Sequence, residues 1–333
     1  RFNLITGNSP GNDTRFYTEK CEAMRNFANK IWNASRFVQM NLTISQYQLP
    51  SAEQLEQEDK WILTKLNALV KEVTENLDSY EIGVASAKVY DFLWDTYCDW
   101  YIELTKSRLN GADEGARLVA QNVLCYVLVQ LLKLLHPFMP FITEEIWQAL
   151  PKTAGETSQY LMTSRWPEYD AALDFPAETE AMEAVMDTIK AIRARRAEMN
   201  VPPSKKAEIV LVTAEPAIYE QGAHFIQRLA YADRVSVTGQ APADLNGLVN
   251  IVTRKANAYI PLSELVDFQA ELERIAREKE KAENGLRITE KKLSNEKFVA
   301  NAPEAVVNAE REKAAKYREL IAKLEESAKA MQG

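Results

Sequence analysis

Cysteine and histidine are scarce in this sequence, and their scarcity excludes several kinds of site. The three cysteines, Cys21, Cys98 and Cys125, are widely spaced and form no CxxC pair. An odd number of scattered cysteines favours neither a disulfide framework nor a zinc site. The two histidines, His136 and His224, have no ligand-like neighbours in the sequence. We therefore expect no bound metal and a reducing compartment such as the cytoplasm.

Long apolar runs and phosphate-binding loops are also missing. No apolar run reaches the roughly 18 residues that span a bilayer, and no signal-peptide pattern occurs at the start. The turn-rich segment 7–12, GNSPGN, lacks the GK[ST] sequence of a phosphate loop. The sequence therefore predicts a water-soluble protein without a nucleotide-binding loop of that type.

Acidic residues outnumber basic residues in the chain as a whole, but not in every segment. Lys and Arg total 40 against 48 Asp and Glu, which gives a net charge of −8 and argues against a general nucleic-acid binder. Segment 1–40 nevertheless holds six basic and three acidic residues, and segment 185–206 holds six and two. Basic patches on an acidic body suit a protein that holds an RNA in one orientation.

The segment 13–40 is predicted to form a helix with two contrasting faces. Apolar residues recur at helical spacing and should face a core: Met24, Phe27, Ile31, Ala34 and Val38. The opposite side alternates guanidinium and amide groups without a carboxylate, and we call it the Arg/Asn face: Arg25, Asn29, Asn33 and Arg36. Arg suits phosphates and base edges, and Asn can read a base. The residues predicted to flank this RNA-binding surface are Lys20, Lys30 and Phe37. A surface helix whose polar side meets only water remains the alternative.

Further helices are predicted to complete a bundle over residues 1–150. Apolar residues at helical spacing indicate them at 59–80, 82–109, 114–135 and 140–150, and the third is apolar nearly all round, as in a buried central helix. One aromatic cluster suggests a base-stacking platform, but its helical spacing is more typical of a bundle core: Trp94, Tyr97, Trp100 and Tyr101.

A connector and a basic helix are predicted over 151–206. The helix, 177–199, carries cations that we expect to be exposed: Lys190, Arg193, Arg195 and Arg196. The three arginines are secondary candidates for phosphate contact, because clustered cations repel one another unless an anion is near. Equally, they are compatible with a basic helix end that complements its own dipole.

The hydrophobic period then changes twice. Over 207–262 it predicts a small α/β subdomain without recognisable chemistry, with a helix at 216–230 and strands at 208–212, 234–237, 249–252 and 258–262. From 263 to 333 a heptad pattern with one interruption predicts an antiparallel coiled-coil arm. Candidate phosphate contacts lie near the tip and the base of this arm: Lys291, Lys292, Lys297, Arg254 and Lys255. Any one of these lysines is also typical of a solubilising coiled-coil position.

Three blocks of sequence resemble one family. NSPGNDTRF (8–16) with RNFANKIWNASRFV (25–38), then LLHPFMPFITEEIW (134–147), then IRARRAEMNVPPSKK (192–206) occur in the order found in bacterial valyl-tRNA synthetases, which are class I aminoacyl-tRNA synthetases. The resemblance covers essentially the whole chain. It implies a mainly α fold, with an anticodon-binding helical bundle, a small α/β subdomain and a tRNA-binding coiled-coil arm.

The resemblance also implies what this chain does not contain. The HIGH-type and KMSKS-type ATP-site signatures and the editing domain are missing, and the chain begins at Arg1 rather than Met, as expected of a C-terminal fragment. We therefore expect no catalytic residue and no cofactor here, whereas the full-length parent would use ATP with Mg to attach valine to tRNA(Val). The family also implies a cytoplasmic monomer that binds no DNA and no membrane.

Two other classes of protein could also account for parts of this sequence. The same region of a sibling enzyme is one: the isoleucine enzyme usually ends in a cysteine-rich zinc unit that three scattered cysteines cannot supply, and the leucine enzyme lacks the coiled-coil hairpin. A coiled-coil scaffold without an RNA role is the other. It accounts for 263–333 but not for the Arg/Asn face.

Overall fold

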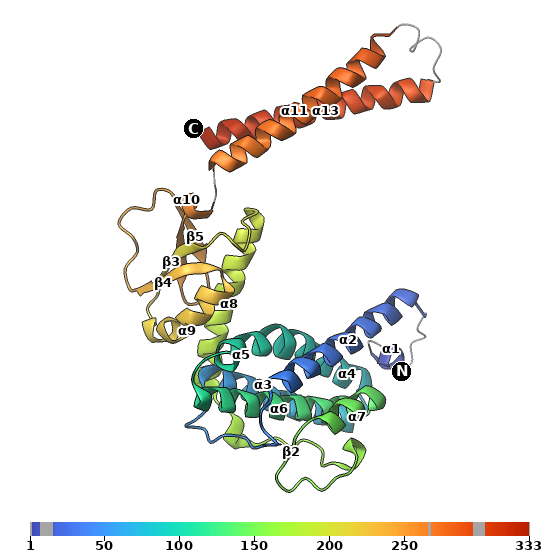
Figure 1. Cartoon of the computed structure of the whole chain (residues 1–333), viewed down its shortest axis with the longest axis vertical. Helices are drawn as coiled ribbons and strands as arrows, with labels where there is room; N and C mark the ends of the chain where they lie inside the picture. Colours follow the sequence, from blue (N-terminus) through green and yellow to red (C-terminus); the bar gives the residue numbers. More distant parts are fainter. Residues whose placement is uncertain (1, 7–15, 266–267, 296–303, 333) are drawn as a thin grey trace. The chain divides into compact units, whose positions relative to one another are not determined.

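The computed structural model describes residues 2–6, 16–265, 268–295 and 304–332 (Figure 1). The chain divides into two compact units, Arg1–Met186 and Asp187–Gly333, which are described separately. The fold is mainly α with one small sheet region, as the sequence predicts.

The first unit is a helical bundle built around α6. A short helix that was not predicted, α1 (Phe2–Ile5), comes first. The other helices lie within or close to the predicted ranges: α2 (Thr18–Asn41), α3 (Gln57–Asp78), α4 (Ile82–Asp91), α5 (Ile102–Leu109), α6 (Glu114–Leu135) and α7 (Pro140–Ala149). The prediction that the first helix starts at residue 13 is wrong in one respect. Phe16 and Tyr17 are not helical, and α2 begins at Thr18 after an extended Tyr17. Asp13 lies outside the described residues.

Helix α6 is the core of this bundle because it is apolar on nearly every side. Twelve of its residues are buried, and the Asp113 carboxylate caps its start by accepting from the backbone N–H of Ala116 at 3.1 Å. Among the described residues, α6 alone is long and apolar enough on average to cross a membrane, although Lys133 and several amides interrupt it. Since 67% of its apolar window is buried inside the structure, it has the environment of a core helix.

The predicted helix 82–109 is not uniform. Between α4 and α5 the chain forms a π-helical segment, η1 (Phe92–Tyr101), with wider i→i+5 hydrogen bonding. Tyr97 and Tyr101 are fully buried there, as predicted for a bundle core. The Tyr97 hydroxyl donates to the Leu124 carbonyl at 3.0 Å and the Tyr101 hydroxyl to Asp59 at 2.7 Å. The segment is thereby fixed to both α6 and α3.

A buried charged cluster joins the start of α3 to α5. The Arg108 guanidinium donates to both oxygens of Asp59, at 2.6 and 2.8 Å, and lies 2.8 Å from Glu58. Burial raises the pKa of Glu58 to about 7, opposed by the nearby Arg108 and assisted by Asp59. Breaking a buried pair of this kind by removing one partner is strongly destabilising.

Two segments outside the predicted helices pair with each other. β1 (Gln46–Tyr47) and β2 (Lys152–Thr153) form a short parallel ladder. Two-residue strands carry too few residues to show a period of two, so sequence periodicity does not reveal them. Single-turn 3-10 helices, η2 (Leu161–Thr163) and η3 (Ala171–Leu173), follow in the connector.

The second unit begins within α8 (Pro176–Glu198) and contains a four-stranded sheet. Its elements are β3 (Ala207–Val212), α9 (Pro216–Leu229), β4 (Ala232–Thr238), β5 (Leu248–Val252), β6 (Asn257–Pro261) and α10 (Leu262–Leu265). The strand order is β4-β3-β6-β5; β3 and β4 are parallel, and the other neighbours are antiparallel. Each predicted strand and the helix lie within two residues of their observed bounds.

The arm is a hairpin of α11 (Phe268–Leu293) and α13 (Glu304–Gln332), which lie side by side (Figure 1). Ion pairs between the helices join Lys279 to Glu325 at 2.8 Å and Lys292 to Glu310 at 3.1 Å. Because later residues of α11 meet earlier residues of α13, the helices are antiparallel. Ala282, Val307 and Ala314, which occupy predicted heptad positions, are buried between the two helices.

Candidate nucleic-acid interface

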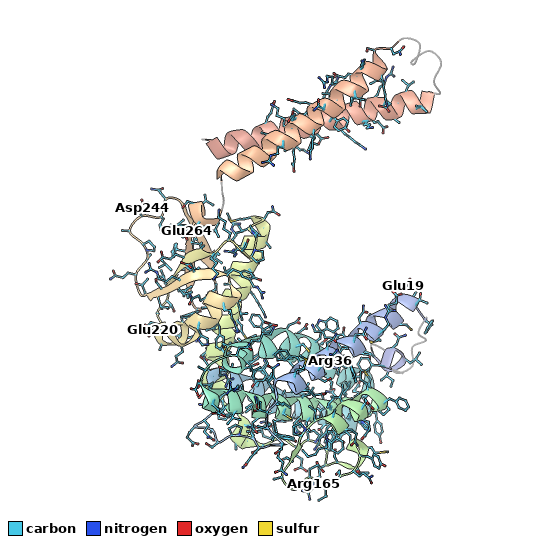
Figure 2. The ribbon with its side chains drawn as sticks, viewed as in Figure 1. Glu19, Arg36, Arg165, Glu220, Asp244 and Glu264 are labelled. Atoms are coloured by element: carbon cyan, nitrogen blue, oxygen red, sulfur yellow. The ribbon has the colours of Figure 1, made fainter. Side chains whose placement is uncertain are left out.

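Helix α2 presents the two faces that its sequence predicts. Phe27, Ile31 and Val38 are fully buried against the bundle, whereas every member of the Arg/Asn face is exposed. Figure 2 marks Arg36 on this helix. Lys20, in the first turn of α2, is also exposed. The cations and amides are therefore held on a rigid helix, with their donors available to a ligand.

The flank of this face is more crowded than the sequence suggests. The Lys30 ammonium lies 2.6 Å from the Asp99 carboxylate and 4.0 Å from the centroid of the Trp94 ring. The Lys106 ammonium lies 5.7 Å from the centroid of the Phe37 ring. Lys30 and Phe37 are thus engaged within the chain, by partners on η1 and α5.

Sequence reasoning missed this second row of residues. Trp94, Asp99 and Lys106 are 64 or more positions away from Lys30, and no local period links them to α2. The helical spacing of Trp94 predicts a core position, but the residue is half-buried and its ring stacks with that of Tyr90 at 5.8 Å between centroids. The Arg/Asn face itself contains no carboxylate, but the Asp99 carboxylate lies at its flank. The negative charge of Asp99 limits where a phosphate can lie.

In the second unit, the arginine cluster is only partly exposed. Arg193 and Arg195 are exposed, and Arg195 pairs with Glu198 at 3.0 Å. The predicted exposure of Arg196 is wrong, because that residue is only 3% exposed. Its guanidinium donates to the carbonyls of Pro202 and Lys205.

The turn after α8 explains the burial of Arg196. Asn200 adopts a left-handed conformation with φ 54°, a common way to end a helix, and the backbone N–H of Val201 bonds back to the Arg196 carbonyl at 2.9 Å. The chain that follows folds over the guanidinium. The ring of Tyr231 lies 5.6 Å from both Arg193 and Arg196, so Arg196 holds the turn together rather than facing a ligand.

The two cations predicted at the base of the arm line a cavity of about 430 Å³ at the ends of β3 and β5, together with Thr213 and Thr253. Arg254 is exposed, while Lys255 is paired with Glu215 at 3.1 Å. The backbone N–H of Arg254 donates to the Asp187 carboxylate at 3.1 Å. Carboxylates therefore border this cavity and reduce its positive potential.

The predicted contact residues of the arm differ in whether they have a partner within the chain. Lys291 and Lys292 are both exposed, but Lys292 is bonded to Glu310. The other oxygen of Glu310 is buried with no hydrogen-bond partner within the part of the chain that the structure describes. Lys292 thus contributes to the hairpin itself. Lys297 lies outside the described residues.

Catalytic chemistry does not emerge from the described residues. Glu144, adjacent to Glu145, accepts from the backbone N–H of Leu161 at 2.9 Å and from Gln148 at 2.7 Å, so it fastens the connector to α7. No group of three or more His, Cys, Asp or Glu is placed to hold a metal ion in the ranges that the structure describes. The exposed features that remain are those of a polar binding surface.

Comparison with known proteins finds two matched regions in the chain. Residues 59–211 match the family described as the anticodon-binding domain of tRNA ligase, and residues 267–332 match the valyl tRNA synthetase tRNA binding arm. The chain is 47% identical to the valine–tRNA ligases of Clostridium acetobutylicum and Clostridium perfringens over 99% and 100% of its length. That of Carboxydothermus hydrogenoformans is 46% identical over 96% of the chain. The chain spans between 36% and 38% of the length of these relatives.

The two matched families therefore define the class: a tRNA-binding region of an aminoacyl-tRNA ligase. The chain belongs to the valine–tRNA ligase family, within which it comprises an anticodon-binding domain and a tRNA-binding arm. The match of the arm, and the identity along the whole chain, favour the valine family over the isoleucine and leucine families and over a scaffold without an RNA role.

Proposed function

We propose that this chain recognises tRNA(Val) on behalf of a ligase that attaches valine to it with ATP and Mg. The chain itself supplies the contacts to the anticodon and to the outer corner of the tRNA, and the parts that carry adenylate formation and editing lie elsewhere in the ligase. Such an enzyme works in the cytoplasm as a monomer.

The observation that carries this proposal is the exposed Arg/Asn face of α2, a helix that packs against α6 and α7 of the segment 59–211 matched to the anticodon-binding family. Unpaired loop bases can be splayed out, stacked and read by their edges, which requires donors and acceptors on a rigid support. The α2 face offers both groups on successive turns. We assign the anticodon contact to Lys20, Arg25, Asn29, Lys30, Asn33, Arg36 and Phe37.

The secondary contacts are proposed for the sugar–phosphate backbone. Exposed cations distant from a base-reading surface add affinity without sequence information. On this basis Arg193, Arg254 and Lys291 are stronger candidates than Arg195, Lys255 and Lys292, which have carboxylate partners. Burial removes Arg196 from this group.

Equilibrium binding to an unmodified tRNA(Val) transcript tests the proposal, with a transcript of another tRNA as competitor. We expect Arg36→Ala to weaken binding to tRNA(Val) more than to the competitor. Arg165→Ala is the matched control, because Arg165 is an exposed arginine on the connector after α7 (Figure 2). The proposal fails if wild-type protein binds neither tRNA, or if both substitutions act alike.

A further inference from the structure

A row of aromatic rings leads from the interior of the bundle to the flank of the Arg/Asn face. Phe2 of α1 and Phe27 of α2 are buried, and their ring centroids are 5.3 Å apart. The centroid of the Tyr90 ring lies 4.4 Å from that of Phe27 and 5.8 Å from that of Trp94. The planes of the Tyr90 and Trp94 rings differ by only 17°. Because Tyr90 and Trp94 are both half-buried, the row reaches the surface at Trp94.

The last ring of this row is occupied by a cation of the same chain. The Lys30 ammonium lies over the Trp94 ring, 4.0 Å from its centroid, and 2.6 Å from the Asp99 carboxylate. The side chain of Lys30 is 23% exposed and that of Asp99 is 51% exposed, so water competes for the ion pair. Exposed cation–π contacts and surface ion pairs contribute little to stability. The ammonium can therefore leave the ring at little cost.

The indole of Trp94 is also incompletely used by the fold. Within the described ranges of the chain, its N–H donates to no protein group, whereas the N–H of Trp166 donates to the Thr74 hydroxyl at 2.9 Å. Trp94 belongs to η1, and π-helical segments are frequent at functional sites. These features describe an aromatic face on a rigid support, with a donor and a displaceable cation beside it.

We propose that Trp94 stacks an unpaired base of the bound RNA, and that this base replaces the Lys30 ammonium over the ring. The proposal rests on the tRNA-binding function proposed above. Stacking of a base on an aromatic side chain is stronger than an exposed cation–π contact, so the exchange is favourable. The released ammonium is then available to a phosphate of the same loop.

The kind of nucleotide follows from the chemistry of the ring. A base within a duplex is stacked on its neighbours, whereas a base in a loop can be splayed out onto an aromatic side chain. Stacking tolerates any base, because every base has a π-face. Trp94 therefore selects single-stranded over paired nucleotides, while the Arg/Asn face reads base edges. Packing against Tyr90 and Phe27 keeps the ring in place when the cation leaves.

Stem-loops with 2-aminopurine at single loop positions test this stacking, because the fluorescence of 2-aminopurine falls when it stacks on an aromatic ring. We expect the wild-type chain to quench at least one loop position on binding. Trp94→Leu should abolish that quench and lower the affinity at least about fivefold, whereas Trp94→Phe should retain most of both. Trp166→Leu is the matched control, since Trp166 is also half-buried but lies on the connector before α8, and it should leave the quench unchanged.

The exchange of the cation for the base has its own test. Lys30→Ala should preserve the quench, because the Trp94 ring is then open before the RNA arrives. The same substitution should reduce the slope of log K against log salt by about 1, since one phosphate contact is lost. A quench that disappears in Lys30→Ala would show that the ammonium holds the base rather than giving way to it.

The proposal is overturned if no loop position is quenched, if Trp94→Leu quenches as the wild type does, or if Trp166→Leu removes the quench as well. Circular dichroism confirms that each variant is folded, and Trp94→Phe keeps the test available if Trp94→Leu does not fold. Affinity for the unlabelled stem-loop is titrated in parallel. Binding without a quench would overturn the stacking role alone, whereas absence of binding would contradict tRNA recognition and the stacking role together.

Discussion

Lys30 and Asp99, 69 positions apart in the sequence, form an ion pair with a separation of 2.6 Å. The pair joins α2 to the π-helical segment η1 at the border of the Arg/Asn face. It has two consequences for RNA binding. Asp99 offsets part of the positive charge of Lys30, and it repels any phosphate that approaches from that side.

Asp99→Asn should therefore strengthen binding of an anticodon stem-loop, by about 0.5–1 kcal/mol at low salt, since an exposed pair contributes on this scale. The salt dependence should steepen, because Lys30 becomes available to a phosphate. Glu72→Gln, which breaks the surface pair between Glu72 and Lys88 elsewhere on the bundle, is the control and should have no effect. A loss of affinity confined to one anticodon would indicate instead that Asp99 accepts a hydrogen bond from a base.

Asn33→Ala and Arg36→Ala should each weaken binding of the cognate anticodon by about 1–3 kcal/mol, as expected for residues that contact base edges. Both residues are exposed, so the substitutions should leave the unfolding transition unchanged. Titration of cognate and non-cognate stem-loops measures the difference. If both RNAs lose affinity equally, these residues contact only the backbone.

Lys291→Gln should lower affinity for whole tRNA without regard to its anticodon, and should reduce the slope of log K against log salt by about 1. The same substitution at Lys292 should also destabilise the arm, because it leaves Glu310 without its ion-pair partner in the seam. Circular dichroism melting separates the two effects. An unchanged salt slope in Lys291→Gln would remove the arm tip from the interface.

The buried cluster at the start of α3 predicts a pH dependence of stability. The pKa of Glu58 is raised to about 7 in the folded state, above its ordinary value, so the folded protein binds the proton more tightly than the unfolded chain. The contribution of Glu58 to stability is therefore fully present below its unfolded pKa and is lost as the pH rises through about 7, by roughly 1–3 kcal/mol. Urea unfolding between pH 5 and 8 should show this decline, and Glu58→Gln should reduce it.

The close approach of Gly285 to Tyr317 predicts a coupled pair in the arm. A Cβ at residue 285 would lie 2.6 Å from the Tyr317 ring, a distance that side chains essentially never adopt. Gly285→Ala should lower the melting temperature of the arm, although alanine favours helix by about 1 kcal/mol over glycine. In a Tyr317→Ala background the same change should be stabilising. If Gly285→Ala stabilises the wild-type arm as well, the ring yields without cost.

Local periodicity explains which parts of this molecule the sequence could predict. Burial follows from the spacing of nearby apolar residues in three places: the heptads of the arm, the strands around Val210 and Ile251, and the apolar helix α6. The Arg/Asn face was predictable for the same reason. Helical spacing alone places its four residues on the side of α2 opposite Phe27 and Ile31.

What the sequence could not predict depends on residues far apart in the chain. The pairing of Lys30 with Asp99 requires knowing that η1 lies beside α2. The burial of Arg196 depends on a turn at Asn200 that returns carbonyl groups over the helix end. The wider winding of η1 leaves the apolar spacing compatible with an ordinary helix, so periodicity does not distinguish the two.

The most direct test of anticodon recognition is equilibrium binding of this chain to a stem-loop with the valine anticodon and to one with the middle base changed, at two salt concentrations. A preference of tenfold or more, about 1.4 kcal/mol, that persists at the higher salt is the predicted result. Equal binding of the two stem-loops, weakened alike by salt, would contradict base recognition by the α2 face.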